Sequence, residues 1–201
     1  MIAILDYGCG NVRAFLNAYE RMKIPCRAAR SAADLEGVRQ VILPGVGAFD
    51  TAMRLFTQSG MRDVVQQRVL EQNIPLLGVC VGMQMLADSS EEGKERGLGW
   101  IPGKVCRIPT PTGLRLPHMG WNQIAPAPNN RLLRDLPAGG RFYFLHSYYF
   151  ECADAAYSGA TVDYGATLTC AVHRERVFGV QFHPEKSHED GMKLLKNFAE
   201  T

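Results

Sequence analysis

The feature that most constrains the fold is the stretch from residue 74 to residue 86, Ile-Pro-Leu-Leu-Gly-Val-Cys-Val-Gly-Met-Gln-Met-Leu. A short apolar run behind a proline is typical of a buried strand in a parallel sheet. The pattern then breaks at Gly78 and Gly82, which lie on either side of Cys80, and resumes with helical spacing. This Gly-x-Cys-x-Gly pattern predicts a tight strand-to-helix turn with a cysteine at its apex.

Such a turn gives the sulfur of Cys80 the setting of a nucleophile. At the start of a helix, unpaired N–H groups and the helix dipole favour a thiolate over a thiol. An ordinary thiol, with a pKa of about 8.5, is only a few per cent ionised at neutral pH, so this position raises its reactivity. The alternative is a buried structural cysteine in a glycine-containing loop, and the partner residues decide between the two.

The overall composition is that of an ordinary globular protein. Of the 201 residues, 46% are hydrophobic and 21% are charged, which suits one domain spanning residues 1–201. The net charge of +2 gives no indication of nucleic acid binding. The chain has no apolar run of about 18 residues and no signal-peptide pattern, so we expect a cytoplasmic protein that does not bind membranes.

Six cysteines are scattered along the chain without a C-x-x-C pair. This spacing favours neither a disulfide framework nor a zinc site, so we expect no metal and no cofactor. Apart from Cys80, most of the cysteines are expected to be small core residues.

Strands and helices alternate in the first half of the chain. Apolar runs at 1–6 and 38–43 precede helical patterns, and Asp50 is the expected N-cap of the second of these helices. This alternation predicts an α/β fold, a doubly wound mixed and mainly parallel sheet flanked by helices. A final helix is expected over 189–200.

The C-terminal half is expected to be rich in antiparallel strands. Its connections are too short for crossover helices, so some neighbouring strands must run in opposite directions. The strand candidates are residues 105–108, 121–124, 141–150, 161–164, 166–172 and 177–182.

His183 stands out among the five histidines because Pro184 and Glu185 follow it. In an extended segment, residues two apart project to the same side, so His183 and Glu185 can point into one site. A carboxylate beside an imidazole holds its productive tautomer while the imidazole takes the proton of a thiol. Taken alone, His-Pro-Glu also fits a strand end with a solvated glutamate. Together with Cys80 it predicts nucleophilic acyl chemistry.

Several motifs together resemble a known family. Residues 78–84 and 179–185 are similar to the class I, triad-type glutamine amidotransferases. This resemblance implies that the sheet is of the flavodoxin-like type. Further segments narrow the resemblance to the glutaminase subunits of imidazole glycerol phosphate synthases. They are Pro-Gly-Val-Gly-Ala-Phe at 44–49, His-Met-Gly-Trp-Asn at 118–122, Tyr-Phe-Leu-His-Ser-Tyr-Tyr at 143–149, and Lys-Ser at 186–187.

The resemblance implies hydrolysis of L-glutamine to glutamate and ammonia by the triad Cys80, His183 and Glu185. Cys80 attacks the side-chain amide, ammonia leaves, and water cleaves the resulting thioester. The oxyanion formed on the way needs two N–H donors. The Val81 amide is one candidate, and the loop containing Val46 and Gly47 is expected to supply the other.

The resemblance also implies substrate-binding and partner-binding residues. Glutamine is expected to be held by Gln84 and the main chain at Gly47, Ser147 and Tyr148. From pattern alone, Gln84 also fits an exposed helix face, and residues 143–150 fit a plain aromatic strand. The expected partner is a (β/α)8-barrel cyclase subunit, which uses the ammonia to make imidazole glycerol phosphate and aminoimidazole carboxamide ribotide in histidine biosynthesis. The residues expected near the docking face are Asn11, His118, Met119, Trp121, Asn122 and Lys186.

Other functions compete with this interpretation. The chain can be a glutaminase that serves a different synthase, or a cysteine hydrolase on the same scaffold. A non-catalytic assembly protein is the third possibility. The complete set Cys80, His183 and Glu185 argues against the last, because such a protein has no use for all three.

Overall fold

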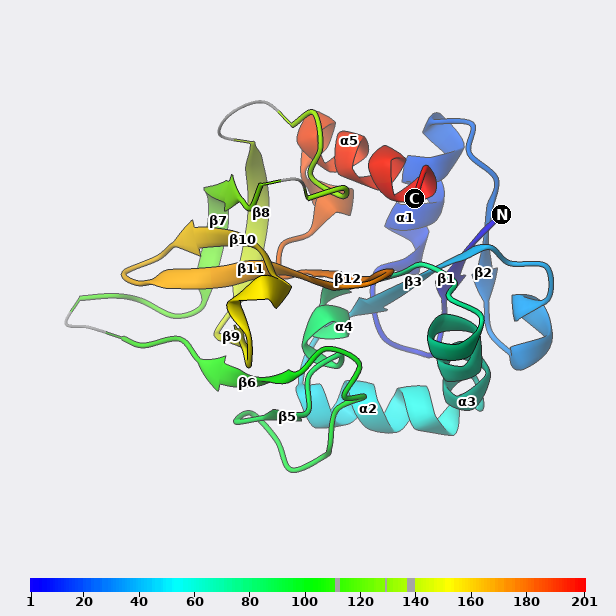
Figure 1. Cartoon of the computed structure of the whole chain (residues 1–201), viewed down its shortest axis with the longest axis horizontal. Helices are drawn as coiled ribbons and strands as arrows, with labels where there is room; N and C mark the ends of the chain where they lie inside the picture. Colours follow the sequence, from blue (N-terminus) through cyan, green and yellow to red (C-terminus); the bar gives the residue numbers. More distant parts are fainter. Residues whose placement is uncertain (111–112, 129, 137–139) are drawn as a thin grey trace.

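The computed structural model describes residues 1–110, 113–128, 130–136 and 140–201 and arranges them around a twisted sheet of nine strands (Figure 1). The strand order in this sheet is β2-β1-β3-β4-β12-β11-β10-β7-β8, and β5, β6 and β9 form a second, smaller sheet. The strands are β1 (Ile2–Leu5), β2 (Cys26–Ala29), β3 (Gln40–Gly45), β4 (Leu76–Cys80), β5 (Ser89–Ser90), β6 (Gly103–Arg107), β7 (His118–Pro126), β8 (Arg141–His146), β9 (Tyr148–Cys152), β10 (Ser158–Asp163), β11 (Thr167–Arg174) and β12 (Val177–Val180).

Helices cover both faces of the parallel part of the sheet. Helices α1 and α5 lie on one face, and α2 and α3 lie on the other (Figure 1). The helices are α1 (Val12–Arg21), α2 (Phe49–Gln58), α3 (Arg62–Gln66), α4 (Val81–Gln84) and α5 (His188–Ala199), and α3 continues into a wider turn over Gln67–Glu71. The doubly wound α/β fold expected from the sequence is confirmed.

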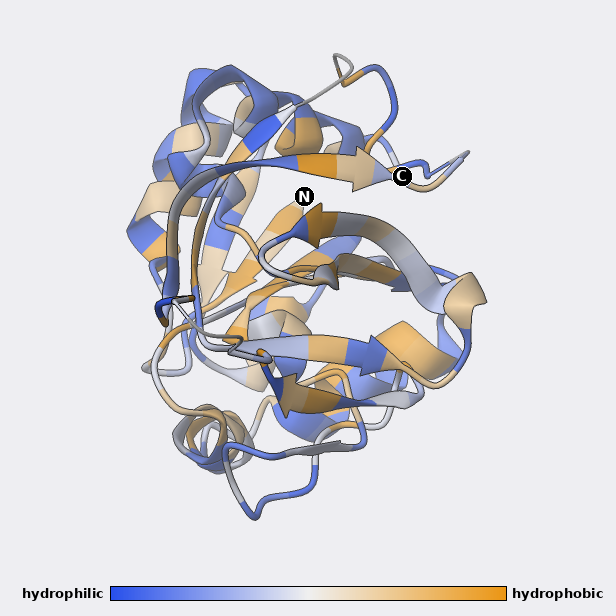
Figure 2. Ribbon diagram, turned by 90° about the vertical axis from the view of Figure 1, so that its left-hand side faces the viewer, coloured by the Kyte–Doolittle hydropathy of each residue, from blue (hydrophilic) through white to orange (hydrophobic). Residues whose placement is uncertain are grey.

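The apolar runs of the sequence become the central strands because helices shield them from water on both faces. Every residue of β1, β3 and β4 is buried. Apolar residues concentrate in the strands, and the surrounding helices alternate polar and apolar positions (Figure 2). Such two-sided burial explains why these strands read as continuous apolar runs rather than as alternating patterns.

The antiparallel half is also confirmed. Strands β11 and β10 pair antiparallel with their neighbours, as do β7 and β8, whereas β12 runs parallel to β4. The candidate strand 141–150 is divided at Ser147, because β8 pairs with β7 in the main sheet and β9 pairs with β6 in the small one. Ser147 therefore stands where the chain passes from one sheet to the other.

The expectation that Asp50 caps helix α2 is wrong. Ala48 is the N-cap, and Asp50 lies in the first turn of the helix. Its carboxylate instead accepts the backbone N–H groups of Lys94 and Glu95, which lowers the pKa of Asp50. A carboxylate that binds a distant loop has no signature in the local sequence, so the sequence pattern predicted an ordinary helix cap at Asp50.

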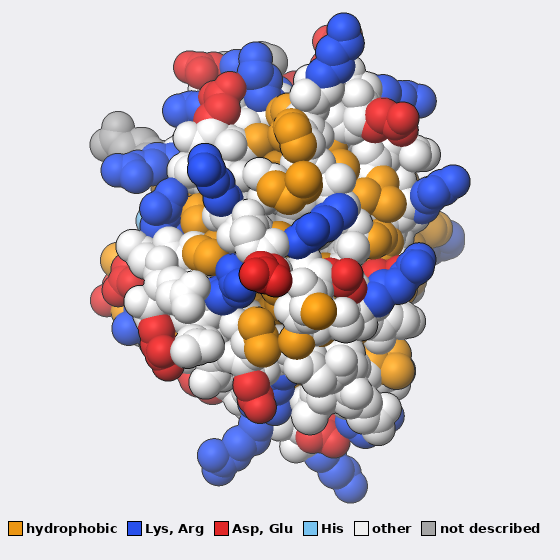
Figure 3. All heavy atoms as spheres, turned by 90° about the vertical axis from the view of Figure 1, so that its right-hand side faces the viewer, with side chains coloured by type: hydrophobic (Ala, Val, Ile, Leu, Met, Phe, Trp, Pro, Cys, Tyr) orange, Lys and Arg blue, Asp and Glu red, His pale blue; other side chains and the backbone are white. Residues whose placement is uncertain are grey.

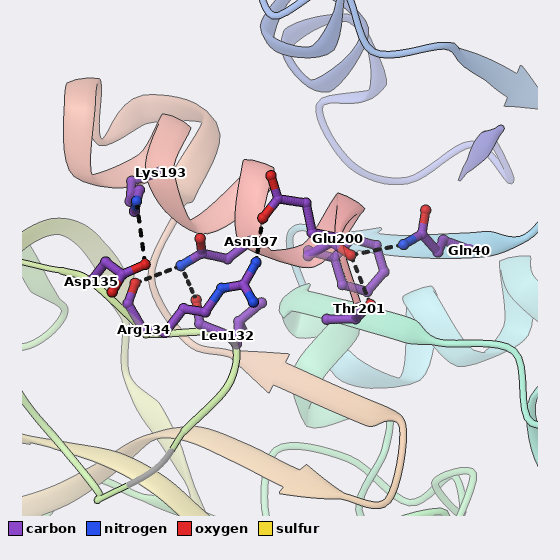
Figure 4. A network of polar contacts seen from close by, with 9 residues as sticks. Gln40, Leu132, Arg134, Asp135, Lys193, Asn197, Glu200 and Thr201 are labelled. Carbon is purple, nitrogen blue, oxygen red and sulfur yellow. Dashed lines mark hydrogen bonds and ion pairs between the residues drawn. The ribbon is translucent and has the colours of Figure 1, made fainter.

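Side-chain hydrogen bonds hold helix α5 against β3 and against residues 132–134 (Figure 4). The buried Asn197 side chain donates to the carbonyls of Leu132 and Arg134, at 3.1 and 2.7 Å. Gln40 at the start of β3 donates to the carbonyl of Phe198 at 2.9 Å. Leu132 and Arg134 lie outside the helices and strands, so Asn197 supplies donors to their carbonyls, whereas the Phe198 carbonyl accepts from Gln40 in addition to Thr201.

The surface carries charges of both signs. On the face seen from the β2 edge of the sheet, Lys and Arg side chains are interspersed with Asp and Glu (Figure 3). None of the helices in the described ranges combines the length and the apolar character needed to cross a membrane.

Candidate active site

Cys80 occupies a strained turn between β4 and α4. Its φ of 56° and ψ of −114° lie outside the strand and helix regions, and it is the N-cap of α4. A Cβ atom on Gly82 would lie 1.9 Å from the carbonyl oxygen of Leu43, and one on Gly78 would lie 2.6 Å from the Gly82 oxygen. The two glycines are therefore required so that β3, β4 and α4 can meet backbone to backbone. Strain of this kind concentrates at functional sites.

His183 and Glu185 lie next to Cys80 because β12 pairs in parallel with β4, and both strands end at the same edge of the sheet. The Nδ1 atom of His183 is 2.9 Å from Oε1 of Glu185, and their side chains are 5% and 1% exposed. The two side chains meet through a 3-10 turn over Pro184–Lys186 rather than through an extended segment. The second oxygen of Glu185, Oε2, is buried and has no hydrogen-bond partner in the described part of the chain.

The surroundings of His183 favour its protonated form. Burial by itself lowers the pKa of the imidazole, but hydrogen bonds to the Cys80 sulfur and the Glu185 carboxylate, with their charges, raise it to about 9. These hydrogen bonds and charges therefore favour an imidazolium on His183, beside the sulfur. An imidazolium next to a cysteine is the arrangement that supports a reactive thiolate.

A cavity of about 300 Å³ opens in front of Cys80. Its lining combines the loop 46–47, residues 145–148 and the triad members Cys80 and His183. Two opposite charges also face it, the ammonium of Lys186 and the carboxylate of Glu92. A small cavity that has a positive and a negative group in its lining suits a zwitterionic amino acid. Glu92 was missed in the sequence, because it lies in a polar loop without any motif.

Two buried amides form the inner wall of the site. Gln84 is only 3% exposed, so the alternative of an exposed helix face is wrong. Its Nε2 donates to the Tyr148 carbonyl at 3.2 Å and to Oε1 of Gln181 at 3.0 Å. Nε2 of Gln181 lies 3.8 Å from the Cys80 sulfur. A carbonyl only accepts, so these bonds fix which end of each amide carries the nitrogen.

The two expected oxyanion donors differ in whether their N–H groups already have an acceptor. Val81 is the first residue of α4, so its N–H has no acceptor within the helix. The Val46 N–H instead donates to the sulfur of Cys9 at 3.4 Å, and the Cys9 thiol lies 3.0 Å from the Val46 carbonyl. The thiol thus binds both backbone groups of Val46. Gly47 has a φ of 79°, which makes this loop a backbone bend that only glycine adopts easily.

Four apolar side chains, Val46, Met119, Trp121 and Leu145, are exposed and are called the apolar rim below. Val46 and Leu145 line the cavity, and Met119 faces Leu145 across the β7–β8 pair. Trp121 stacks on the ring of His188 at 5.0 Å.

The other residues expected at the docking face occupy different environments. Asn11 and Lys186 are exposed, and Lys186 extends over the Tyr143 ring. Asn122 is half-buried. His118 is only 3% exposed and lies beneath this surface, so its side chain is hidden from anything that docks there. In the described residues no group of three His, Cys, Asp or Glu side chains is placed to hold a metal ion.

Comparisons with known proteins agree with this geometry. The model of the family "Glutamine amidotransferase class-I" matches residues 3–201. The chain is 53% identical to the imidazole glycerol phosphate synthase subunit HisH of Bdellovibrio bacteriovorus, with all of both chains covered. It is 48% identical to the HisH subunit of Leptospira interrogans, with 99% of each covered. A crystal structure described as a glutamine amidotransferase has the same fold, with a TM-score of 0.77 at 24% identity over 100% of this chain and 99% of the other.

Proposed function

The chain belongs to the class I glutamine amidotransferase family, and on this premise we propose that Cys80, His183 and Glu185 carry its chemistry. The enzyme hydrolyses L-glutamine to glutamate and ammonia and supplies the ammonia to the cyclase subunit of an imidazole glycerol phosphate synthase, in histidine biosynthesis. The observation that carries the proposal is that His183, held by Glu185 at 2.9 Å, and Cys80 line the same small cavity.

In the first half of the reaction, the Cys80 thiolate attacks the side-chain amide carbon of glutamine. A C–S bond forms, and the electron pair of the C=O bond moves to the oxygen. His183 then gives its proton to the amide nitrogen, the C–N bond breaks, and ammonia leaves a thioester on Cys80. Glu185 holds the proton of Nδ1, so that the other ring nitrogen faces the sulfur and the leaving group.

In the second half, His183 is neutral and takes a proton from water. The resulting hydroxide attacks the thioester carbon, and the C–S bond breaks. The electron pair of that bond stays on the sulfur as the Cys80 thiolate, and the new carboxylic acid of glutamate loses its proton to the solvent. The proton taken from water stays on His183, which restores the starting imidazolium. Both halves pass through a tetrahedral oxyanion that requires N–H donors.

The Val81 N–H and a donor from the loop at Val46 and Gly47 stabilise that oxyanion. Since the Val46 N–H is bound to Cys9, this donor must be released before it can serve. Losing one donor typically costs about 2.7–4 kcal/mol of barrier. The loop therefore limits the activity of the chain without its partner.

Glutamine is held at its amino-acid end. The nitrogen of Gln84 is bound to Tyr148 and Gln181, so its oxygen is left to accept from the substrate. The main chain at Gly47, Ser147 and Tyr148 completes this part of the site, and all three residues line the cavity. Lys186 and Glu92 place opposite charges near the carboxylate and the ammonium of the substrate.

The cyclase partner, a (β/α)8 barrel, docks over the mouth of the cavity. The apolar rim supports this placement, because exposed apolar patches beside an active site mark interaction surfaces. Asn11, Asn122 and Lys186 form the polar surroundings of that interface, and His118 supports it from below. Docking there keeps the released ammonia out of bulk water.

The proposal is tested by measuring ammonia release from L-glutamine by the purified chain, alone and with the cyclase subunit and its ribotide ligand. We expect low activity alone, a large rise with both additions, and none in Cys80→Ala. High activity that ignores the cyclase would instead support a glutaminase for a different synthase or a free-standing hydrolase. Unchanged ammonia release by folded Cys80→Ala would refute the role of Cys80 as the nucleophile.

A further inference from the structure

Two buried imidazoles that have no role in the chemistry above form a hydrogen bond with each other at the wall of the cavity. Nδ1 of His118 is 2.9 Å from Nε2 of His146. His118 comes from β7 and is stacked between the rings of Phe144 and Tyr164, at centroid distances of 4.6 and 4.0 Å. His146 is the last residue of β8 and lines the cavity.

Carbonyl groups at both ends determine which atoms in this pair donate. Nδ1 of His146 is 2.8 Å from the Tyr148 carbonyl, which only accepts, so this nitrogen carries the proton. Burial lowers the pKa of His146 to about 3 and that of His118 to about 4, so both rings are neutral. The Nε2 of His146 is then an acceptor, and His118 must donate to it from Nδ1.

The same reasoning extends the chain of bonds outward. With its proton on Nδ1, His118 has an acceptor at Nε2, which lies 3.3 Å from Nδ2 of Asn122. The other hydrogen of that amide goes to the carbonyl of Asp163 at 2.9 Å. Asn122, His118 and His146 therefore donate in one direction, from β7 toward the cavity.

The chain of bonds ends on the amide that faces the substrate. The Tyr148 carbonyl accepts from His146 and also from Nε2 of Gln84. Gln84 in turn donates to Gln181, whose own amide nitrogen lies beside the Cys80 sulfur. Any rotation of the Tyr148 peptide would therefore turn the Gln84 amide and change what it offers to a ligand.

We propose that His118 and His146 are positioning residues for glutamine, a fixed-tautomer imidazole pair that orients the Tyr148 carbonyl and, through it, the Gln84 amide. This inference rests on the proposed function, since it concerns binding of the same substrate. The pair touches neither the reacting carbon nor the sulfur. Its loss therefore affects substrate binding more than turnover, and KM changes more than kcat.

The experiment compares variants that keep or remove each donor. His146→Asn keeps an N–H at the position of Nδ1, whereas His146→Leu removes it. His118→Leu removes the outer donor and leaves a buried acceptor on His146 unpaired. His173→Leu is the matched control, an imidazole of β11 that lies outside the cavity.

KM and kcat for L-glutamine are measured with the cyclase subunit present. We expect KM to rise about tenfold in His146→Leu and about threefold in His118→Leu, with kcat lowered less than about threefold. His146→Asn, which keeps the Nδ1 donor but loses the acceptor of His118, should raise KM no more than His118→Leu does, and His173→Leu should stay within about twofold of the parent KM. An unchanged KM in folded His146→Leu, or equal losses in the Asn and Leu variants, would overturn the inference.

Nitrogen-detected NMR of the imidazoles in the parent chain provides a test that needs no variant to fold. The inference requires both His118 and His146 to be neutral at pH 7 with the proton on Nδ1. A proton on Nε2 of His146 would overturn it. A parent chain without glutaminase activity in the presence of the cyclase subunit and its ribotide ligand would refute the proposed function, whereas normal activity with the wrong tautomers would refute this inference alone.

Discussion

Replacing Glu185 by Gln tests how the imidazole is held. The substitution keeps the shape of the side chain and removes the charge that lies 2.9 Å from His183. The second oxygen of Glu185 has no partner in the described residues, so the new amide can place its NH2 there and keep its oxygen on the Nδ1–H. We therefore expect the productive tautomer to survive while the charge stabilisation is lost.

The size of the loss follows from the pKa of His183. The shift from 6.5 to about 9 corresponds to about 3 kcal/mol in favour of the imidazolium, and Cys80 contributes more of it than Glu185. We assign Glu185 a share of about 1–2 kcal/mol, which is roughly fivefold to thirtyfold in kcat. His183→Ala removes the base itself and should cost at least about tenfold more.

The assay is the pH profile of kcat/KM for glutamate formation. In the parent chain we expect activity to fall above about pH 9, as His183 loses its proton. In Glu185→Gln this fall should begin about 0.7–1.5 pH units lower, because a stabilising negative charge is gone. His183 also contributes stability that is complete below about pH 6.5 and is lost as the pH rises through 9, so the stability difference between the two proteins should shrink along that range.

Two results would refute this reasoning. An alkaline limb that does not move would mean that Glu185 exerts no charge effect on His183. A loss as large as that of His183→Ala would mean that the amide turns its NH2 toward Nδ1 and inverts the tautomer.

Three further predictions concern the surrounding structure. Gly82→Ala should lower the free energy of unfolding, measured by urea denaturation, by more than about 3 kcal/mol, because its Cβ would lie 1.9 Å from the Leu43 oxygen. Gly140→Ala is the control, because a Cβ at that position makes only ordinary contacts. Cys9→Ala should raise ammonia release by the isolated chain several-fold, since the Val46 N–H loses its acceptor, and unchanged or lower release would contradict the role given to this loop. Asn197→Leu should lower the free energy of unfolding by about 2–3 kcal/mol, because two carbonyls lose their hydrogen-bond donor. KM should stay unaltered because Asn197 does not line the cavity, and a changed KM would contradict this structural role.

The elements that the sequence predicted well are those with a local signal. The apolar run before Cys80 and its flanking glycines describe a strand and a turn that cannot tolerate a Cβ, so position and chemistry appear in the same few residues. The final helix was likewise predicted from its periodic pattern, and the antiparallel strands from connections too short for crossover helices.

The parts that the sequence did not predict depend on contacts between distant segments. Asp50 binds a loop more than forty residues away, and Glu92 reaches the cavity only through that loop. The contact of Cys9 with Val46 joins the loops that follow β1 and β3, and no spacing pattern in the sequence predicts it. The pairing of His118 with His146 depends on the register of β7 against β8, which sequence patterns leave open.

The most direct test of the central claim is to look for the thioester. Rapid-quench mass spectrometry of the complex during turnover with L-glutamine should find a glutamyl group attached to the peptide that contains Cys80, and the adduct should accumulate in Glu185→Gln if hydrolysis slows more than attack. Ammonia release without any adduct on Cys80, or an adduct on another cysteine, would contradict the account.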